Sequence, residues 1–383
     1  MIRIPVKKLK TGMIVSQSIY NKRGASYLVK GQRITMQYIR QLKKIGIPTV
    51  TVTSSDPSIN LPPPEDIVQE KTRVTAIEKV FDAFQSVEET GRLDASAMED
   101  VADKIIFDVI QRRENLVQLT DIRLHDAYTF AHSVNVAILS AMVGNLCHFS
   151  KDDLFLLTLG ALLHDLGKVS TPLNILNKTT SLDQDEFATI REHPINGAKR
   201  IHSMEHLLPS PGILAAIASQ HHEHMDGTGY PYHLQGDQIH RFARIVAIAD
   251  VYDALTSERP YKKAYTPSLA HNIMTRVSQS QFDPKLMTLF FDNVALYPVG
   301  TILKTVYGFG IVRESHFGHT QTPIVCIFAD KERNILEEPV VLDLTSDGPK
   351  AVEMVINGNE LHHFIHEIHF DPTMYLLPEE NEN

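Results

Sequence analysis

Five histidines and two aspartates in this chain lie within or beside apolar stretches, and their side chains are of types that bind metal ions. They are His132, His164, Asp165, His193, His221, His222 and Asp250. Burying such side chains costs free energy unless another interaction replaces their hydration, and a metal ion provides that interaction. The set contains no thiolate, which favours iron, manganese, cobalt or nickel over a structural zinc site.

The number of ligands indicates a catalytic centre. Two six-coordinate ions offer twelve positions, and the seven side chains fill eight of them if the Asp165 carboxylate bridges both ions. Four positions remain for water and substrate oxygens, which a catalytic site needs and a structural site lacks. We therefore expect two divalent transition-metal ions, iron or manganese, and hydrolysis of a phosphodiester by a metal-activated hydroxide.

A helical domain over residues 121–292 is predicted to position these ligands, because apolar residues recur there at helical spacing. One helix should end near His164 and another should start near Phe242, which places ligands at or near helix ends. Residues 67–120 show the same periodicity and are predicted to form a helical connector, with Asp94 as the N-cap of its second helix.

The flanking segments have a different pattern. Short strand-like runs and one helix over 35–45 predict a small α+β domain at 1–53, and the four prolines of 54–66 predict a linker. Residues 293–377 are predicted to form a small β domain, followed by an acidic, disordered tail at 378–383. The expected strands of the β domain are 300–306, 309–313, 323–328 and 339–344.

Composition limits the classes of partner. The net charge of −9 argues against a basic surface for nucleic-acid polymers, so an anionic substrate would need a local basic site. Cys147 and Cys326 are the only cysteines, and we interpret them as reduced core residues. With no visible signal peptide and no uninterrupted apolar run long enough for a membrane span, a cytoplasmic location is expected.

The chain resembles the HD-GYP family, a subgroup of the HD metal-dependent phosphohydrolases, over about residues 121–292. The family motifs are matched by His164-Asp165-Leu-Gly-Lys168 and by His221-His222-Glu-His-Met-Asp226-Gly-Thr-Gly229-Tyr230-Pro231. The resemblance implies a mainly α fold, with an HD-type helical bundle as catalytic domain between the two small domains. It also implies hydrolysis of cyclic di-GMP to the linear dinucleotide pGpG and, in some members, to GMP.

One position departs from part of the family. Some members carry a glutamate four residues before the first histidine, where it supports a third metal ion. Tyr128 stands at that position here. A phenol is a poor ligand near neutral pH because its ordinary pKa is about 10, so we expect two ions.

The resemblance also suggests residues that contact the substrate. Lys168 and Asp165 are the expected catalytic residues, with Lys168 stabilising negative charge on the phosphate; the helix macrodipole alone would also favour a lysine there. Arg259 and Lys262 are expected to hold the second phosphate or a guanine edge, unless they belong to an ordinary solvated loop.

The loop after the histidine pair completes the predicted substrate site through Asp226, Gly229 and Tyr230. Gly227 and Gly229 should permit unusual backbone angles. Tyr230 could stack on a guanine, although formation of a turn explains the Gly-Tyr-Pro sequence as well.

The predicted partner is a cyclic dinucleotide, and a homodimer and signalling proteins bound through the N-terminal domain are further candidates. Two alternative functions stay open. The substrate could be 3′,3′-cyclic GMP-AMP, because the groups that read the bases cannot be placed. The chain could also be a cyclic di-GMP receptor with slow turnover, although its complete ligand set argues against an inactive enzyme.

Overall fold

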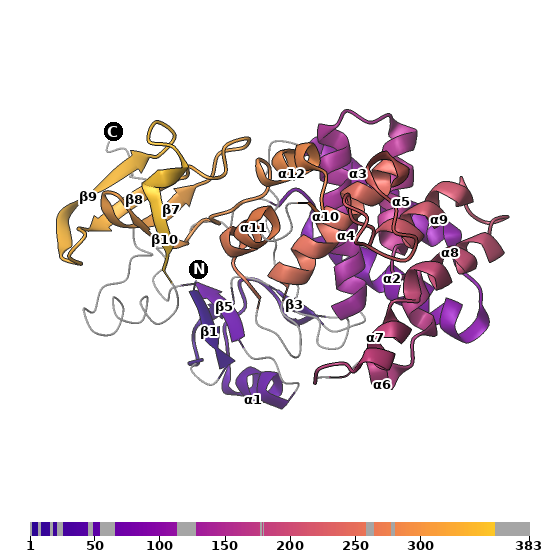
Figure 1. Cartoon of the computed structure of the whole chain (residues 1–383). Coiled ribbons are helices and arrows are strands. Elements are labelled where there is room, and N and C mark those ends of the chain that lie inside the picture. The colour runs from indigo at the N-terminus through magenta and orange to yellow at the C-terminus, as the bar shows by residue number, and fades with distance from the viewer. Residues whose placement is uncertain are drawn as a thin grey trace. The chain divides into compact units, whose positions relative to one another are not determined.

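The computed structural model describes most of the chain (Figure 1). The described residues are 2–6, 9–15, 18–20, 26–44, 49–53, 66–112, 128–176, 178, 180–257, 264–276 and 280–356. One compact unit contains the described part of Asp66–Phe290, and the other contains the described parts of Met1–Tyr20, Ser26–Glu65 and Phe291–Asn383. The predicted tail and all of the predicted linker except Asp66 lie outside the described residues.

The N-terminal segment combines short strands with one helix, as the sequence predicts. Its elements are β1 (Ile2–Pro5), β2 (Ile14–Val15), β3 (Ile19–Tyr20), β4 (Ser26–Leu28), α1 (Met36–Lys44) and β5 (Thr49–Thr53). The antiparallel sheet has the order β1-β5-β2, and β3 pairs with β4. Strand β1 was not predicted from the sequence.

The C-terminal segment is an antiparallel five-stranded sheet with the order β10-β6-β7-β8-β9. Its strands are β6 (Ile302–Thr305), β7 (Gly308–Glu314), β8 (Ile324–Ala329), β9 (Ile335–Asp343) and β10 (Val352–Val355). The strand predicted at 339–344 begins later than β9, and β10 was not predicted. Both are edge strands with little buried surface, so neither shows a clear apolar alternation. Pro339 is tolerated inside β9 because an edge strand leaves some N–H positions unpaired.

The larger unit is helical. Its elements are α2 (Glu70–Thr90), α3 (Ala95–Gln111), α4 (Tyr128–Leu146), α5 (Lys151–Leu163), η3 (Leu166–Ser170), α6 (Leu173–Leu176), α7 (Gln184–Ile190), α8 (His193–Ser203), α9 (Pro211–Gln220), η4 (Gly236–Gln238), α10 (Arg241–Thr256) and α11 (Pro267–Arg276), with α12 (Pro284–Phe291) at its end. Asp94 is the N-cap of α3, as predicted, since its Oδ1 accepts a hydrogen bond from Ala97 N at 3.0 Å.

Helices α4 and α5 form the centre of this unit (Figure 1). Helix α4 packs against α2, α3, α5 and α10, while α5 also packs against α9. Consecutive residues of both helices are buried on every side, as in the run Leu157–Leu163 of α5, which is the pattern of a core helix. Helix α8 packs against α9 and η3. No helix among the described residues has the length and apolar character needed to cross a membrane.

Candidate metal centre

All seven predicted ligands come together at the ends and centres of five helices. His132 projects from α4 and Asp250 from α10, both inside their helices. The others lie at helix boundaries: His164 caps α5 and precedes Asp165, His193 opens α8, and His221 caps α9 and precedes His222. Six of the seven are buried, and the His222 side chain is 24% exposed.

Helix ends orient three of the imidazoles. The Nδ1 atoms of His164 and His193 lie 2.7 Å from the carbonyl oxygens of Ala161 and Ile190, and His221 Nδ1 lies 2.9 Å from that of Ala218. The last carbonyls of a helix lack intrahelical partners, so they are free to accept these bonds. Because a carbonyl can only accept, Nδ1 carries the proton in each ring and Nε2 keeps its lone pair for a metal ion.

A carboxylate orients the fourth imidazole. His132 Nδ1 lies 2.6 Å from Asp253 Oδ2, and its Nε2 lies 3.0 Å from Asp250 Oδ1. Asp253 is fully buried three residues after Asp250, on the same face of α10. It was not among the predicted site residues. A second carboxylate one helical turn after a predicted ligand was the sequence signal that could have identified it.

The Asp165 carboxylate lies between two sets of imidazoles. Its Oδ1 is 3.4 Å from His193 Nε2 and 3.9 Å from His221 Nε2. Its Oδ2 is 3.4 Å from His164 Nε2 and 3.8 Å from His132 Nε2. Three groups have ligand atoms within 4.8 Å of one another: His193 with His221 and His222, His132 with His164 and Asp250, and His164 with Asp165 and His221.

These residues fit a metal site. The buried atoms His164 Nε2 and Asp165 Oδ1 have no hydrogen-bond partner among the described residues. Buried polar atoms are nearly always partnered, and leaving one unpaired costs about 1–3 kcal/mol. Both atoms point into the histidine cluster, so metal coordination would satisfy them.

The electrostatics of the cluster favour ligand forms. Burial lowers the pKa of His193 to about 3 and that of His222 to about 4, so both imidazoles are neutral near pH 7. Burial opposes ionisation of Asp165, but Lys168 and the surrounding imidazoles outweigh it and hold its pKa well below the usual range. Burial also opposes protonation of His132, but hydrogen bonds with Asp250 and Asp253 prevail and raise its pKa to about 9. A metal ion bound at Nε2 would therefore displace a proton from His132.

Lys168 and Gly167 follow the ligand pair on η3. Lys168 Nζ donates a hydrogen bond to Asp165 Oδ2, and the lysine side chain is 23% exposed. Gly167 is required by close approach: a Cβ atom there would lie 1.9 Å from His193 O and 2.5 Å from Gly197 N. The missing side chain lets η3 touch α8, which brings Asp165 and His193 together.

Tyr230 lies beside the cluster. Its ring stacks on His222 with a centroid distance of 4.8 Å and an interplanar angle of 24°, and its N–H donates to His222 O at 3.1 Å. The guanidinium of Arg191 lies 4.3 Å from the centroid of the Tyr230 ring. Among the described residues, no carboxylate forms an ion pair with Arg191. Sequence reasoning missed this arginine, and its place two residues before the ligand His193 was the available signal.

Asp226 and the glycines shape the loop that carries Tyr230. Asp226 accepts hydrogen bonds from Thr228 N, Thr228 Oγ1 and Ser280 Oγ at 2.9, 2.7 and 2.6 Å. The expected unusual backbone is present at Gly227, with φ of 79°, but the expectation is wrong at Gly229. Gly229 is needed for space, because a Cβ there would lie 2.3 Å from His224 N.

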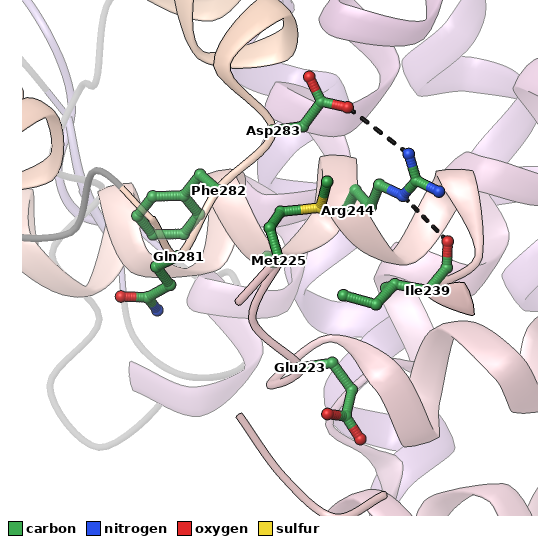
Figure 2. A pocket seen from close by; sticks show the side chains of 8 residues that line it. Glu223, Met225, Ile239, Arg244, Gln281, Phe282 and Asp283 are labelled. Carbon is green, nitrogen blue, oxygen red and sulfur yellow. Dashed lines mark hydrogen bonds and ion pairs between the residues drawn. The ribbon is translucent and has the colours of Figure 1, made fainter. Parts of the chain in front are cut away.

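Figure 2 shows a small pocket, and residues that line it hold the same loop through hydrogen bonds. Buried Glu223 accepts from Tyr232 N and Leu234 N at 2.6 and 3.0 Å, while Met225 N donates to Gln281 O at 3.0 Å. Arg244 donates to Ile239 O at 2.9 Å (Figure 2). None of the predicted ligands lines this pocket.

Arg259, Lys262 and the side chain of Tyr128 lie outside the described residues.

Comparisons with known proteins identify relatives of this chain. A family model described as an HD domain matches residues 101–286. A protein named cyclic di-GMP phosphodiesterase from Pseudomonas aeruginosa is 30% identical, in an alignment covering 90% of this chain and 89% of that protein. A 3′3′-cGAMP-specific phosphodiesterase from Vibrio cholerae is 34% identical, covering 45% of this chain and 36% of that protein.

The fold is shared with a solved structure. The structure of an HDG"Y"P protein from Bdellovibrio bacteriovorus matches with a TM-score of 0.50 at 20% identity, covering 76% of this chain and 98% of that one. At this identity the match concerns the fold alone.

Proposed function

This chain belongs to the HD-GYP family of HD-domain phosphohydrolases, and we propose that it is a metal-dependent phosphodiesterase that hydrolyses cyclic di-GMP. The observation that carries the proposal is the position of Asp165, whose two oxygens face separate sets of imidazole nitrogens. A carboxylate so placed can bridge two metal ions. The relative from Pseudomonas aeruginosa, aligned over most of both chains, supports the choice of substrate.

Two ions, iron or manganese, are proposed for the cluster. His132, His164 and Asp250 would hold one ion, and His193, His221 and His222 the other, with Asp165 shared. The donor set of imidazoles and carboxylates suits these metals. When bound, the ions supply a hydroxide nucleophile near neutral pH and offset negative charge on the phosphate.

Lys168 is proposed to act on the phosphate from the side of Asp165. Its hydrogen bond with Asp165 fixes the ammonium beside the cluster, and its partial exposure leaves it open to a ligand. Negative charge grows on the non-bridging oxygens during attack, and a pre-placed cation stabilises it. Lys168 and Asp165 are thus the proposed catalytic residues, and Lys168 is also proposed to bind the substrate.

Further substrate contacts are proposed for residues outside the cluster. The guanidinium of Arg191 lies over the ring of Tyr230, which stacks on His222. No carboxylate of the described residues pairs with this guanidinium, so it can take a phosphate or a guanine edge. The bonds of Asp226 with Thr228 and Ser280 support a role in shaping the substrate loop, together with Gly229. Arg259 and Lys262 remain the proposed cations for the second phosphate.

A second candidate substrate is 3′,3′-cyclic GMP-AMP. The relative from Vibrio cholerae that carries this specificity in its name aligns with 45% of this chain. The metal cluster acts on a phosphodiester irrespective of the base, so it does not separate the two dinucleotides. We also propose that the chain forms a homodimer, that its N-terminal segment binds signalling proteins, and that it is located in the cytoplasm.

The test is product analysis with metal-reconstituted protein. The protein is incubated with cyclic di-GMP or with 3′,3′-cyclic GMP-AMP, and products are separated by chromatography. We expect pGpG, and GMP at longer times, from the first substrate. His193→Ala should abolish the reaction, whereas His202→Ala should not, because His202 is exposed on the same helix. Faster turnover of 3′,3′-cyclic GMP-AMP would favour the second candidate, and tight binding without products would indicate a receptor.

A further inference from the structure

A chain of hydrogen-bonded polar side chains connects helix α2 with the proposed metal ligand His132 through the core of the helical unit. At the ligand end, His132 Nδ1 lies 2.6 Å from Asp253 Oδ2. Asn135 Nδ2 donates to Asp253 Oδ1 at 2.8 Å, and Arg73 Nη1 donates to Asn135 Oδ1 at 2.6 Å. Arg73 Nη2 completes the chain with a bond to Asp66 Oδ2 at 2.7 Å.

The donors and acceptors of the chain fix the orientation of the Asn135 amide. Arg73 can only donate, so the oxygen of the Asn135 amide must face it and the amide nitrogen must face Asp253. Ser257 Oγ also donates to Asp253 Oδ1, at 2.9 Å. The other Asp253 oxygen is left for the Nδ1 proton of His132. The orientation of the His132 ring therefore depends on the order of donors that begins at Arg73.

Packing alone does not explain Arg73. Its side chain is 2% exposed, and its neighbours on the buried face of α2 include Ala76, Ile77 and Val80. An apolar residue would suit such an interface, because replacing a buried ion pair by apolar residues is often neutral or stabilising. Buried charges of this kind are retained in some proteins because they specify one arrangement of their partners. Arg73 lies outside residues 101–286, the segment that matches the HD-domain family model, so the family match does not account for it.

We propose that Arg73 is a positioning residue for the metal centre. It acts through Asn135 and Asp253, holding the His132 imidazole with Nε2 directed toward Asp250 and Asp165. Helix α2, anchored at Asp66, thereby sets the metal affinity of a site whose ligands all lie on other elements. The inference rests on the proposed function only in requiring that the cluster binds metal.

The experiment measures Mn²⁺ affinity of the full chain by competition with a chelator, alongside the melting temperature of the metal-free protein. We expect Arg73→Met and Asn135→Ala each to weaken Mn²⁺ binding by about tenfold, the lower end of the range for groups that support metal ligands. Arg73→Lys keeps the charge but loses the planar fork, so its loss should be smaller. Gln69→Ala is the control, since Gln69 Nε2 ties the start of α2 to Asp108 at 3.1 Å outside this chain of bonds.

A double variant separates positioning from general destabilisation. If both residues act along one chain, Arg73→Met combined with Asn135→Ala should bind Mn²⁺ about as well as Asn135→Ala alone. Unchanged affinity in both single variants, or losses that multiply in the double variant, would overturn the proposal. If Arg73→Met does not fold, Arg73→Lys takes its place in the same cycle. Wild-type protein that binds Mn²⁺ but hydrolyses no dinucleotide would refute the proposed function and leave this inference standing.

Discussion

Replacing Gly167 by alanine should disturb the metal centre without touching a ligand. The added Cβ would lie 1.9 Å from His193 O, whereas real Cβ contacts essentially never fall below 3.0 Å. Helix α8 and η3 must therefore separate by about 1 Å, because the blocking atoms belong to backbone. Asp165 and His193, whose ligand atoms are 3.4 Å apart, sit on the two parts that separate.

The expected effect on catalysis is large. A misplacement of about 1 Å can cost about a hundredfold in rate, so we expect kcat to fall by that order and metal content to drop. Overpacking should cost about 1–3 kcal/mol of unfolding free energy. The measurements are metal analysis, steady-state hydrolysis of cyclic di-GMP and thermal unfolding of the same preparation.

Gly212→Ala is the matched control. Gly212 lies in α9, and a Cβ there would meet no atom within 4 Å. Gly212 is the second residue of α9, where part of the preference of roughly 0.5–1 kcal/mol for alanine in a helix interior applies, so this variant should be about as stable as the wild type, with full activity. If Gly167→Ala retains metal and turnover like the control, the close approach of η3 and α8 does not determine the site geometry.

Three further perturbations test other parts of the site. Asp165→Asn should remove activity and lower the metal content measured by elemental analysis, because the bridging charge is lost; full activity would refute the ligand assignment. Arg191→Ala should raise KM by roughly tenfold or more with metal content unchanged, since a hydrogen bond to a charged group contributes about 1.5–3 kcal/mol. Arg241→Ala is the control: it removes a guanidinium that lies over Phe149 and should leave KM unchanged. If KM is unchanged in Arg191→Ala as well, Arg191 does not contact the substrate. The hydrogen bonds from Ser280 and Thr228 lower the pKa of Asp226 to about 2 from an ordinary 3.8. Its contribution to loop stability is therefore present above about pH 4 and lost as the pH falls toward 2, so melting temperatures of Asp226→Asn should vary less over that interval than those of the wild type, and parallel curves would contradict this.

The strands show where sequence reasoning fails for physical reasons. The approximate positions of β6, β7 and β8 follow from short apolar runs between turn residues, because these strands have partners on both sides and much buried surface. The edge strand β10 has no fully buried residue, so its sequence shows no clear apolar alternation that would separate it from a loop. Its pairing with β6 depends on a partner nearly fifty residues earlier in the chain, at Ile302–Thr305.

The sequence by itself identified the side chains that are proposed to bind metal. These seven residues lie within or beside apolar helical patterns, where burying their side chains is costly unless a metal ion binds them, and the motif around His164 and Asp165 indicates the family. It also predicted that several ligands lie at helix ends, where free carbonyls can orient imidazole rings.

Only the tertiary structure decided how the ligands are grouped and what holds them. The division of the histidines between the two oxygens of Asp165 depends on the packing of α4, α5, α8 and α9. Asp253 is 121 positions from His132, and Arg73 is 62 positions from Asn135. No local pattern encodes such distances, because hydrogen-bond partners far apart in sequence are brought together by burial of the apolar faces around them.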